Sequence, residues 1–216
     1  MSESHPFSVR QQEYDRPFAA IYCGSRTGHD ARYMTLAAEV GRQLALAGWG
    51  LVYGGGDSGL MGAVAQSALT AGAPVIGVMS DVLIQREKCL DGLTELHNTQ
   101  TICERKRVMG ERANAFIILP GGVGTWEEFT EVATGRMLEL HQKPMILLNF
   151  NNYYAGLIQQ LRQAVQEGFL DAGELEHVVV TDTAEALVPL LATTLDGWRD
   201  ARHLALALQV SDPVVP

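Results

Sequence analysis

The chain has 216 residues, 47% of them hydrophobic and 19% charged, which indicates a folded globular protein with one substantial core. Its net charge of −9, with no compensating Lys- or Arg-rich run, argues against nucleic-acid binding. Three cysteines without paired spacing argue against a disulfide framework or a zinc site. The opening residues lack the apolar stretch of a signal peptide, and no segment reaches the length of a membrane span. We therefore expect a cytoplasmic protein without membrane contact.

Short apolar runs alternate with longer segments of helical periodicity, which is the pattern of a parallel sheet covered by helices. In chain order we expect strand Phe18–Cys23, helix Ala31–Ala47, strand Leu51–Tyr53, helix Leu60–Ala71, strand Pro74–Met79, a long loop Ser80–Gln100 with an extended piece near Leu93–Asn98, helix Ile102–Arg112, strand Ala115–Leu119, helix Trp126–Leu140, strand Met145–Asn149, helix Tyr153–Glu167, strand Val178–Val180 and helix Ala184–Leu195. This order predicts a single-domain α/β fold, a doubly wound parallel sheet, over residues 18–195. Residues 1–17 would form an N-terminal extension and residues 196–216 a C-terminal tail.

A first glycine-rich turn follows the second predicted strand, where residues 54–59 read Gly-Gly-Gly-Asp-Ser-Gly. This segment satisfies the Gly-x-Gly-x-x-Gly pattern of dinucleotide-binding turns, but it follows the second strand instead of the first. Gly55 and Gly56 are candidates for contact with a phosphate or a ribose. The alternative is that these glycines only permit a tight turn and close helix packing.

A second, more specific turn follows the strand at 115–119, where residues 120–128 read Pro-Gly-Gly-Val-Gly-Thr-Trp-Glu-Glu. Its glycines free the backbone to curl around an anion, and we expect Thr125 to open the next helix, whose N-terminal N–H groups attract phosphate. The alternative for Thr125 and Glu128 is a capping box, in which the carboxylate folds back to the backbone and only stabilises the helix.

Two further segments are expected near the same edge of the sheet. Residues 104–107 read Glu-Arg-Lys-Arg at the start of a predicted helix, although most such charge runs are solvated helix faces. Residues 23–25 read Cys-Gly-Ser at the end of the first strand, so Ser25 is a candidate to supply a hydroxyl or an N–H group. Alternatively, Cys23 is a buried strand residue and Ser25 caps a turn.

Several segments, taken together, resemble the LOG (Lonely Guy) family. They are the two glycine segments, the Cys-Gly-Ser strand end, residues 93–96 (Leu-Thr-Glu-Leu), residues 104–106 (Glu-Arg-Lys) and the Lys143-Pro144 turn. Proteins of this family are often mislabelled as lysine decarboxylases. The resemblance covers about residues 19–191. It implies a Rossmann-like homodimer that hydrolyses cytokinin riboside 5′-monophosphates, and frequently AMP, to the free base and ribose 5-phosphate, with no metal and no cofactor.

The resemblance also assigns roles to individual residues. The family's catalytic arginine and glutamate fall on Arg105 and Glu128. Its substrate contacts fall on the two catalytic residues and on Lys106, Glu87 and the turn formed by Gly121, Gly122, Val123, Gly124 and Thr125.

Three rival functions follow from the same motifs. Molybdenum cofactor carriers share the Pro-Gly-Gly-x-Gly-Thr turn and bind without turnover, so a non-catalytic nucleotide or cofactor carrier is the main alternative. An NAD(P)-linked oxidoreductase and a lysine decarboxylase stand behind it. Decarboxylation would need pyridoxal phosphate on a lysine, and none of the three lysines has a context typical of such an attachment site.

A homodimer is expected from the resemblance and from an apolar stripe on the predicted helix 126–140. The stripe consists of Phe129, Val132, Ala133, Met137 and Leu140. The alternative is that this stripe only faces the sheet.

Overall fold

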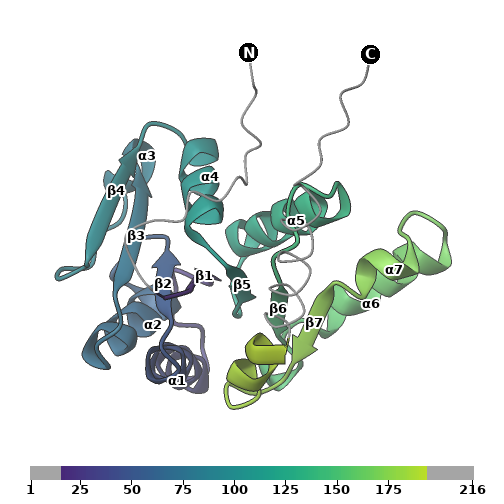
Figure 1. Cartoon of the computed structure of the whole chain (residues 1–216), viewed down its shortest axis with the longest axis horizontal. Coiled ribbons are helices and arrows are strands. Elements are labelled where there is room, and N and C mark those ends of the chain that lie inside the picture. Colours follow the sequence, from purple (N-terminus) through teal and green to yellow (C-terminus); the bar gives the residue numbers. More distant parts are fainter. Residues whose placement is uncertain (1–15, 194–216) are drawn as a thin grey trace, which may run out of the picture.

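The computed structural model describes residues 16–193 and confirms the α/β fold, with one sheet of seven parallel strands flanked by helices (Figure 1). Along the sheet the strands follow the order β4-β3-β2-β1-β5-β6-β7. The strands are β1 Phe18–Tyr22, β2 Gly50–Tyr53, β3 Val75–Ser80, β4 Glu95–Thr99, β5 Ala115–Ile118, β6 Met145–Leu148 and β7 Val178–Thr181. The helices are α1 Arg32–Leu46, α2 Gly59–Thr70, α3 Asp81–Ile84, α4 Ile102–Arg112, α5 Val123–Met137, α6 Ala155–Gln166 and α7 Ala172–Leu175, with a 3₁₀ turn η1 at Phe150–Asn152 and further helical residues at 187–193.

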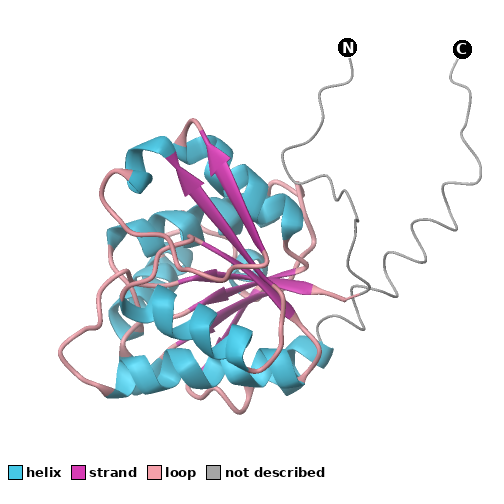
Figure 2. Cartoon of the chain, turned by 90° about the vertical axis from the view of Figure 1, so that its left-hand side faces the viewer, coloured by secondary structure: helices cyan, strands magenta, loops and turns pink. Residues whose placement is uncertain are grey.

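Helices cover both faces of the sheet (Figure 2), which explains why the central strands are apolar at every position instead of every second one. Alternate residues of a strand point to opposite faces. Ala19 and Ile21 of β1 accordingly join a core formed with α1 and α2, while Ala20 and Tyr22 join a core formed with α4, α5 and α6. The sheet therefore separates two hydrophobic cores.

The strand order reverses direction at β1, which pairs with β2 on one side and with β5 on the other. The chain builds outward from β1 to β4, and then returns to build from β5 to β7. In doubly wound sheets the crevice beyond the carboxyl ends of the strands at such a switch point is the usual place for a ligand. A ligand is therefore expected at the loops that follow β1 and β5.

Several element bounds differ from the sequence prediction. The extended piece expected near residues 93–98 is a full edge strand, β4, and α3 and α7 were not foreseen. Helix α5 begins at Val123 and ends at Met137, three residues earlier at each end than predicted. It ends early because Glu139 takes a left-handed backbone conformation with φ of 58°.

The apolar stripe on α5 divides into two parts. Phe129, Val132 and Ala133 are buried in the core shared with β1 and β5, as the alternative interpretation required. Met137 and Leu140, the other two residues of the stripe, are half-buried. Most of the stripe therefore faces the sheet, and homodimerisation stays a prediction.

The proposed division of the chain extends beyond the described residues. The predicted domain start at residue 18 coincides with the first residue of β1. The tail 196–216, and the extension 1–17 apart from its last two residues, lie outside the described range. Within that range, no helix combines the length and the apolar character that a membrane crossing requires.

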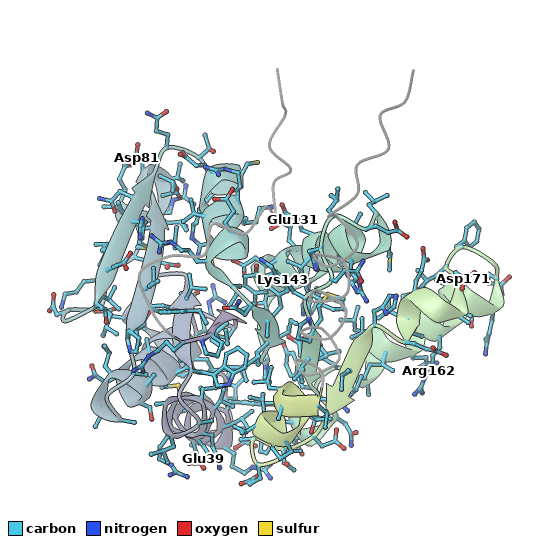
Figure 3. All side chains as sticks on the ribbon, viewed as in Figure 1. Glu39, Asp81, Glu131, Lys143, Arg162 and Asp171 are labelled. Atoms are coloured by element: carbon cyan, nitrogen blue, oxygen red, sulfur yellow. The ribbon has the colours of Figure 1, made fainter. Side chains whose placement is uncertain are left out.

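A buried polar pair, His141 and Lys143, connects α5, β6 and α4 away from the glycine loops (Lys143 is labelled in Figure 3). His141 Nε2 lies 2.9 Å from the carbonyl oxygen of Val132, and its Nδ1 accepts the N–H of Lys143 at 3.2 Å. The Lys143 ammonium donates to the Gly110 carbonyl in the last turn of α4 at 2.7 Å. Burial lowers the pKa of His141 to about 4, so the imidazole stays neutral in the folded protein.

This pKa predicts a specific loss of stability in acid. Above about pH 6.5 the imidazole is neutral in both states, whereas between about pH 6.5 and 4 only the unfolded chain binds the proton. The free energy of unfolding should fall by about 3 kcal/mol across that window, and His141→Gln should flatten the fall. Urea unfolding of both proteins from pH 7 to 4 measures the difference. Equal pH slopes would show that His141 titrates normally.

Candidate active site

The loops after β1, β2 and β5 meet at the carboxyl edge of the sheet. The N–H of Gly24, just after β1, donates to the carbonyl of Pro120 at 3.0 Å, and the Gly24 carbonyl accepts the N–H of Leu60 at 3.0 Å. One short segment after β1 therefore holds the first glycine turn on one side and the second on the other. The sequence prediction had placed all three segments at one edge, and the structure brings them into direct contact.

The second glycine turn leads directly into the N-terminus of α5. Gly122 is the N-cap residue and has no side chain with which to cap the helix, so the first N–H groups of α5 are left for another partner. Val123 and Gly124 in this first turn are exposed, whereas Thr125 is buried. The turn offers backbone donors and the positive end of a 15-residue helix to an anion.

The expected position of Thr125 was wrong by one helical turn. We expected this residue to open the helix, but α5 starts at Val123 and Thr125 lies third in it. The capping box between Thr125 and Glu128 is absent, since both residues lie within the helix and the Glu128 carboxylate bonds to Arg105 instead. Gly122 takes the extended conformation of an N-cap residue, so the helix begins three residues earlier than predicted.

Arg105 of α4 and Glu128 of α5 form a largely buried ion pair. Arg105 Nη1 lies 3.1 Å from Glu128 Oε1, and the two side chains are only 8% and 13% exposed. Arg105 Nε donates to the carbonyl of Val78 at 2.8 Å, which ties the guanidinium to β3. A Cβ atom at Gly54 would lie 2.3 Å from Arg105 Nη2, so only glycine leaves room for this guanidinium at the end of β2. The pair is therefore held by α4, α5, β2 and β3 together.

Burial raises the pKa of Glu128 to about 7, although the charge and the hydrogen bond of Arg105 act in the opposite direction. A carboxyl group with this pKa exchanges its proton near neutral pH, which suits acid–base or electrostatic work in a reaction. Two neighbours titrate well above their normal range. Burial, followed by the Glu128 charge, raises the pKa of both Tyr22 and Cys23, so these groups stay protonated.

Lys106 is paired with two carboxylates of α5. Its ammonium bonds to the carboxylates of Glu127 and Glu131, and its side chain is only 11% exposed (Glu131 is labelled in Figure 3). These two ion pairs link α4 to the first turns of α5. The charge of Lys106 acts on the neighbouring Glu128. The same charge is already balanced by the carboxylates of Glu127 and Glu131.

The first glycine turn is covered by the loop after α3. The Asp57 N–H donates to the Lys88 carbonyl at 3.0 Å, the Leu90 N–H donates to the Gly55 carbonyl at 3.0 Å, and Gly56 pairs with Cys89. A carboxylate oxygen of Glu87 lies 3.2 Å from the place where a Cβ at Gly56 would stand. The structure thus brings Glu87, Gly55 and Gly56 together, with both glycines buried.

Ser25 lies on the other side of this turn and meets it through its backbone. Its carbonyl accepts the Ser58 hydroxyl at 3.3 Å. Gly59 has a φ of +58°, and a Cβ there would stand 2.3 Å from the Ser25 carbonyl carbon, so the two segments pack backbone to backbone. Cys23 is buried, as one of its two interpretations required.

Sequence reasoning missed two tyrosines that complete the site. The Tyr153 hydroxyl donates to the Gly121 carbonyl and the Tyr154 hydroxyl donates to the Leu119 carbonyl, both at 2.6 Å. Both residues follow β6, the next strand after β5 in the sheet. Their position just beyond a strand's carboxyl end was the signal that could have found them.

Comparison with known proteins supports a single family. A family model described as "Possible lysine decarboxylase" matches residues 61–191. A cytokinin riboside 5′-monophosphate phosphoribohydrolase of Rhodococcoides fascians is 42% identical over 169 residues, which cover 78% of this chain and 85% of the relative. A protein of the same name from Arabidopsis thaliana is 39% identical over 184 residues, covering 85% of each. The chain belongs to the LOG family.

Solved structures similar to this LOG-family chain share its fold. A Moco carrier protein from Chlamydomonas reinhardtii superimposes with a TM-score of 0.65 at 20% identity, over 84% of this chain and 99% of that one. A molybdenum cofactor binding protein from Rippkaea orientalis gives a TM-score of 0.65 at 21% identity, over 85% and 99%. At this identity the likeness establishes the Rossmann-like fold of the LOG-family chain and says nothing of its ligand.

Proposed function

We propose that this chain hydrolyses the N-glycosidic bond of nucleoside 5′-monophosphates to a free base and ribose 5-phosphate. The single observation that carries the proposal is the buried Arg105–Glu128 pair beside the N-terminus of α5. The relatives named phosphoribohydrolases support the reaction type. Cytokinin riboside 5′-monophosphates, named for those relatives, and AMP are the candidate substrates.

The proposed chemistry assigns Glu128 to the ribose. Cleavage of the bond builds positive charge on the ribose ring, which an adjacent carboxylate stabilises while it positions or deprotonates the attacking water. The ionised form of Glu128 is required for this role, and its pKa of about 7 makes that form available at neutral pH. The low exposure of the pair strengthens its electrostatic effect, because little water screens the charges.

Arg105 has two roles in the proposal. Its guanidinium lowers the pKa of Glu128, and so increases the ionised fraction of the carboxylate. Its fork of donors, already fixed at Nε by the Val78 carbonyl, orients ribose or phosphate oxygens. The 5′-phosphate then lies on the turn 121–125, with Lys106, Glu87, Ser25, Gly55 and Gly56 around the remainder of the substrate.

We also propose that the enzyme is a cytoplasmic homodimer, that its LOG-family domain spans residues 18–195 and that the reaction needs neither metal nor cofactor. Lysine decarboxylation is not proposed for this chain, despite the description attached to the family model.

The 5′-phosphate should decide whether a substrate is accepted. Without it, the turn 121–125 and the N-terminus of α5 lose the anion that they bind, so kcat/KM for adenosine should be at least about a hundredfold below that for AMP. Chromatographic assay of free base from AMP, N6-substituted adenosine monophosphates and the matching nucleosides measures the ratio. Comparable turnover of nucleotide and nucleoside would contradict the assignment of the turn to phosphate.

A further inference from the structure

The turn that follows β5 has all of its carbonyl groups engaged. The Leu119 carbonyl accepts the Tyr154 hydroxyl at 2.6 Å, and the Gly121 carbonyl accepts the Tyr153 hydroxyl at 2.6 Å. The Pro120 carbonyl accepts the Gly24 N–H at 3.0 Å, and the Gly122 carbonyl accepts the Trp126 N–H at 3.1 Å. In a trans peptide the carbonyl and the N–H of the next residue point in opposite directions. Each bond that holds a carbonyl therefore also sets the direction of an N–H group.

Tyr153 differs from Tyr154 in what its bond controls. The peptide after Leu119 leads into Pro120, which has no N–H, so the buried Tyr154 hydroxyl orients no donor. The peptide after Gly121 carries the N–H of Gly122, which precedes α5. Tyr153 is the side chain that fixes the direction of a backbone donor in this turn.

The chain after β6 is shaped to present Tyr153. Asn151 and Asn152 adopt left-handed conformations with φ of 54° and 57°, which asparagine tolerates better than most residues. The Tyr153 ring then meets the Tyr33 and Tyr154 rings edge-on at 5.8 and 4.9 Å. Neighbouring rings thus position the hydroxyl, while 39% of the residue remains exposed at the edge of the crevice.

We propose that Tyr153 is a positioning residue for the phosphate group of the substrate. By holding the Gly121 carbonyl, its hydroxyl keeps the Gly122 N–H aimed away from the tyrosine and toward the anion at the start of α5. The inference rests on the proposed function, because it requires the turn to receive the 5′-phosphate. Tyr153 adds a residue from the loop after β6 to a phosphate site otherwise formed by β5 and α5.

Tyr153→Phe is the sharpest test, because it removes the hydroxyl and keeps the ring packing. Affinity for AMP and for ribose 5-phosphate, measured by calorimetry, should fall about three- to tenfold, the range that one modest hydrogen bond carries. Affinity for adenosine should not change. In the base-release assay KM for AMP should rise by the same factor with kcat nearly unaltered, since Tyr153 does not contact the Arg105–Glu128 pair.

Tyr33→Phe is the matched control. It removes a hydroxyl from the same aromatic group, and within residues 16–193 that hydroxyl holds no carbonyl of the turn. Its affinity for AMP should equal that of the wild type. A purely structural role for Tyr153 would instead lower the thermal midpoint and weaken AMP and adenosine alike, and this result would overturn the inference.

The outcomes separate this inference from the proposed function. If the wild type prefers AMP to adenosine and Tyr153→Phe keeps that preference in full, the inference on Tyr153 is wrong and the phosphate assignment stands. If the wild type shows no preference for the phosphorylated ligand, the turn is not a phosphate site and both fail.

Discussion

Replacing Glu128 with Gln is expected to lower base release by about a hundredfold or more, while binding of the nucleoside monophosphate stays largely intact. Glutamine keeps the shape of the side chain and can still accept a hydrogen bond from Arg105 Nη1. The variant loses the negative charge that we propose to face the developing positive charge on the ribose. Single-turnover assays of base release and calorimetric binding of AMP, carried out on the same preparation, measure the two effects separately.

Glu111→Gln provides a matched control for this variant. Glu111 is a helical carboxylate paired with Arg107 on the surface of α4, so the same chemical change there should leave both activity and binding near the wild-type values. Full activity in Glu128→Gln would remove this residue from the chemistry. Binding of AMP by a wild type that releases no base from any nucleotide tested would instead favour the carrier function.

Replacing Arg105 with Ala is expected to weaken both binding and catalysis, and to move the pH dependence of the reaction. In the wild type, kcat/KM should rise with pH through about 7 as Glu128 ionises. Loss of the guanidinium removes the group that lowers the Glu128 pKa, so this limb should move to higher pH. At pH 7 the loss in kcat/KM should reach about a hundredfold.

The pH profile distinguishes this role from simple loss of structure. Arg105→Lys retains a positive charge but lacks the forked donors of the guanidinium. It should therefore restore the pH at which kcat/KM rises more fully than it restores affinity for AMP. Arg107→Ala, two residues along α4, removes an arginine whose 2.6 Å bond to Glu111 lies at the surface, and it should change neither property. An Arg105→Ala profile with an unmoved limb would show that Arg105 does not govern the ionisation of Glu128.

Much of the fold could be read from the sequence because the central strands are short and wholly apolar. Helix α4 has the predicted bounds, Ile102–Arg112, and the structure shows the Thr101 side chain capping its N-terminus. Edge strand β4 was less visible. Its half-buried positions are the polar residues Glu95 and His97, each followed by an exposed residue, and pairing with β3 makes this segment a strand.

The site was harder to read because its key contacts are made between distant segments. Arg105 and Glu128 lie 23 residues apart, and local reasoning favoured a solvated helix face for one and left a capping box open for the other. The family resemblance singled out both residues, and the structure adds the contact between them. Nothing in the local sequence around Tyr153 shows that its hydroxyl reaches Gly121, because that bond depends on how β5 and β6 align.

The two ion pairs of Lys106 have a kinetic consequence. Around the crevice the positive charges of Arg105 and Lys106 are opposed by the carboxylates of Glu128, Glu127 and Glu131, in a chain whose net charge is −9. For the phosphorylated substrate and product that we propose, this charge balance predicts repulsion at long range, with attraction only where the N–H dipoles act, within about one helical turn. We therefore expect slow encounter and little recapture of a product that has left the turn, which would favour turnover over retention.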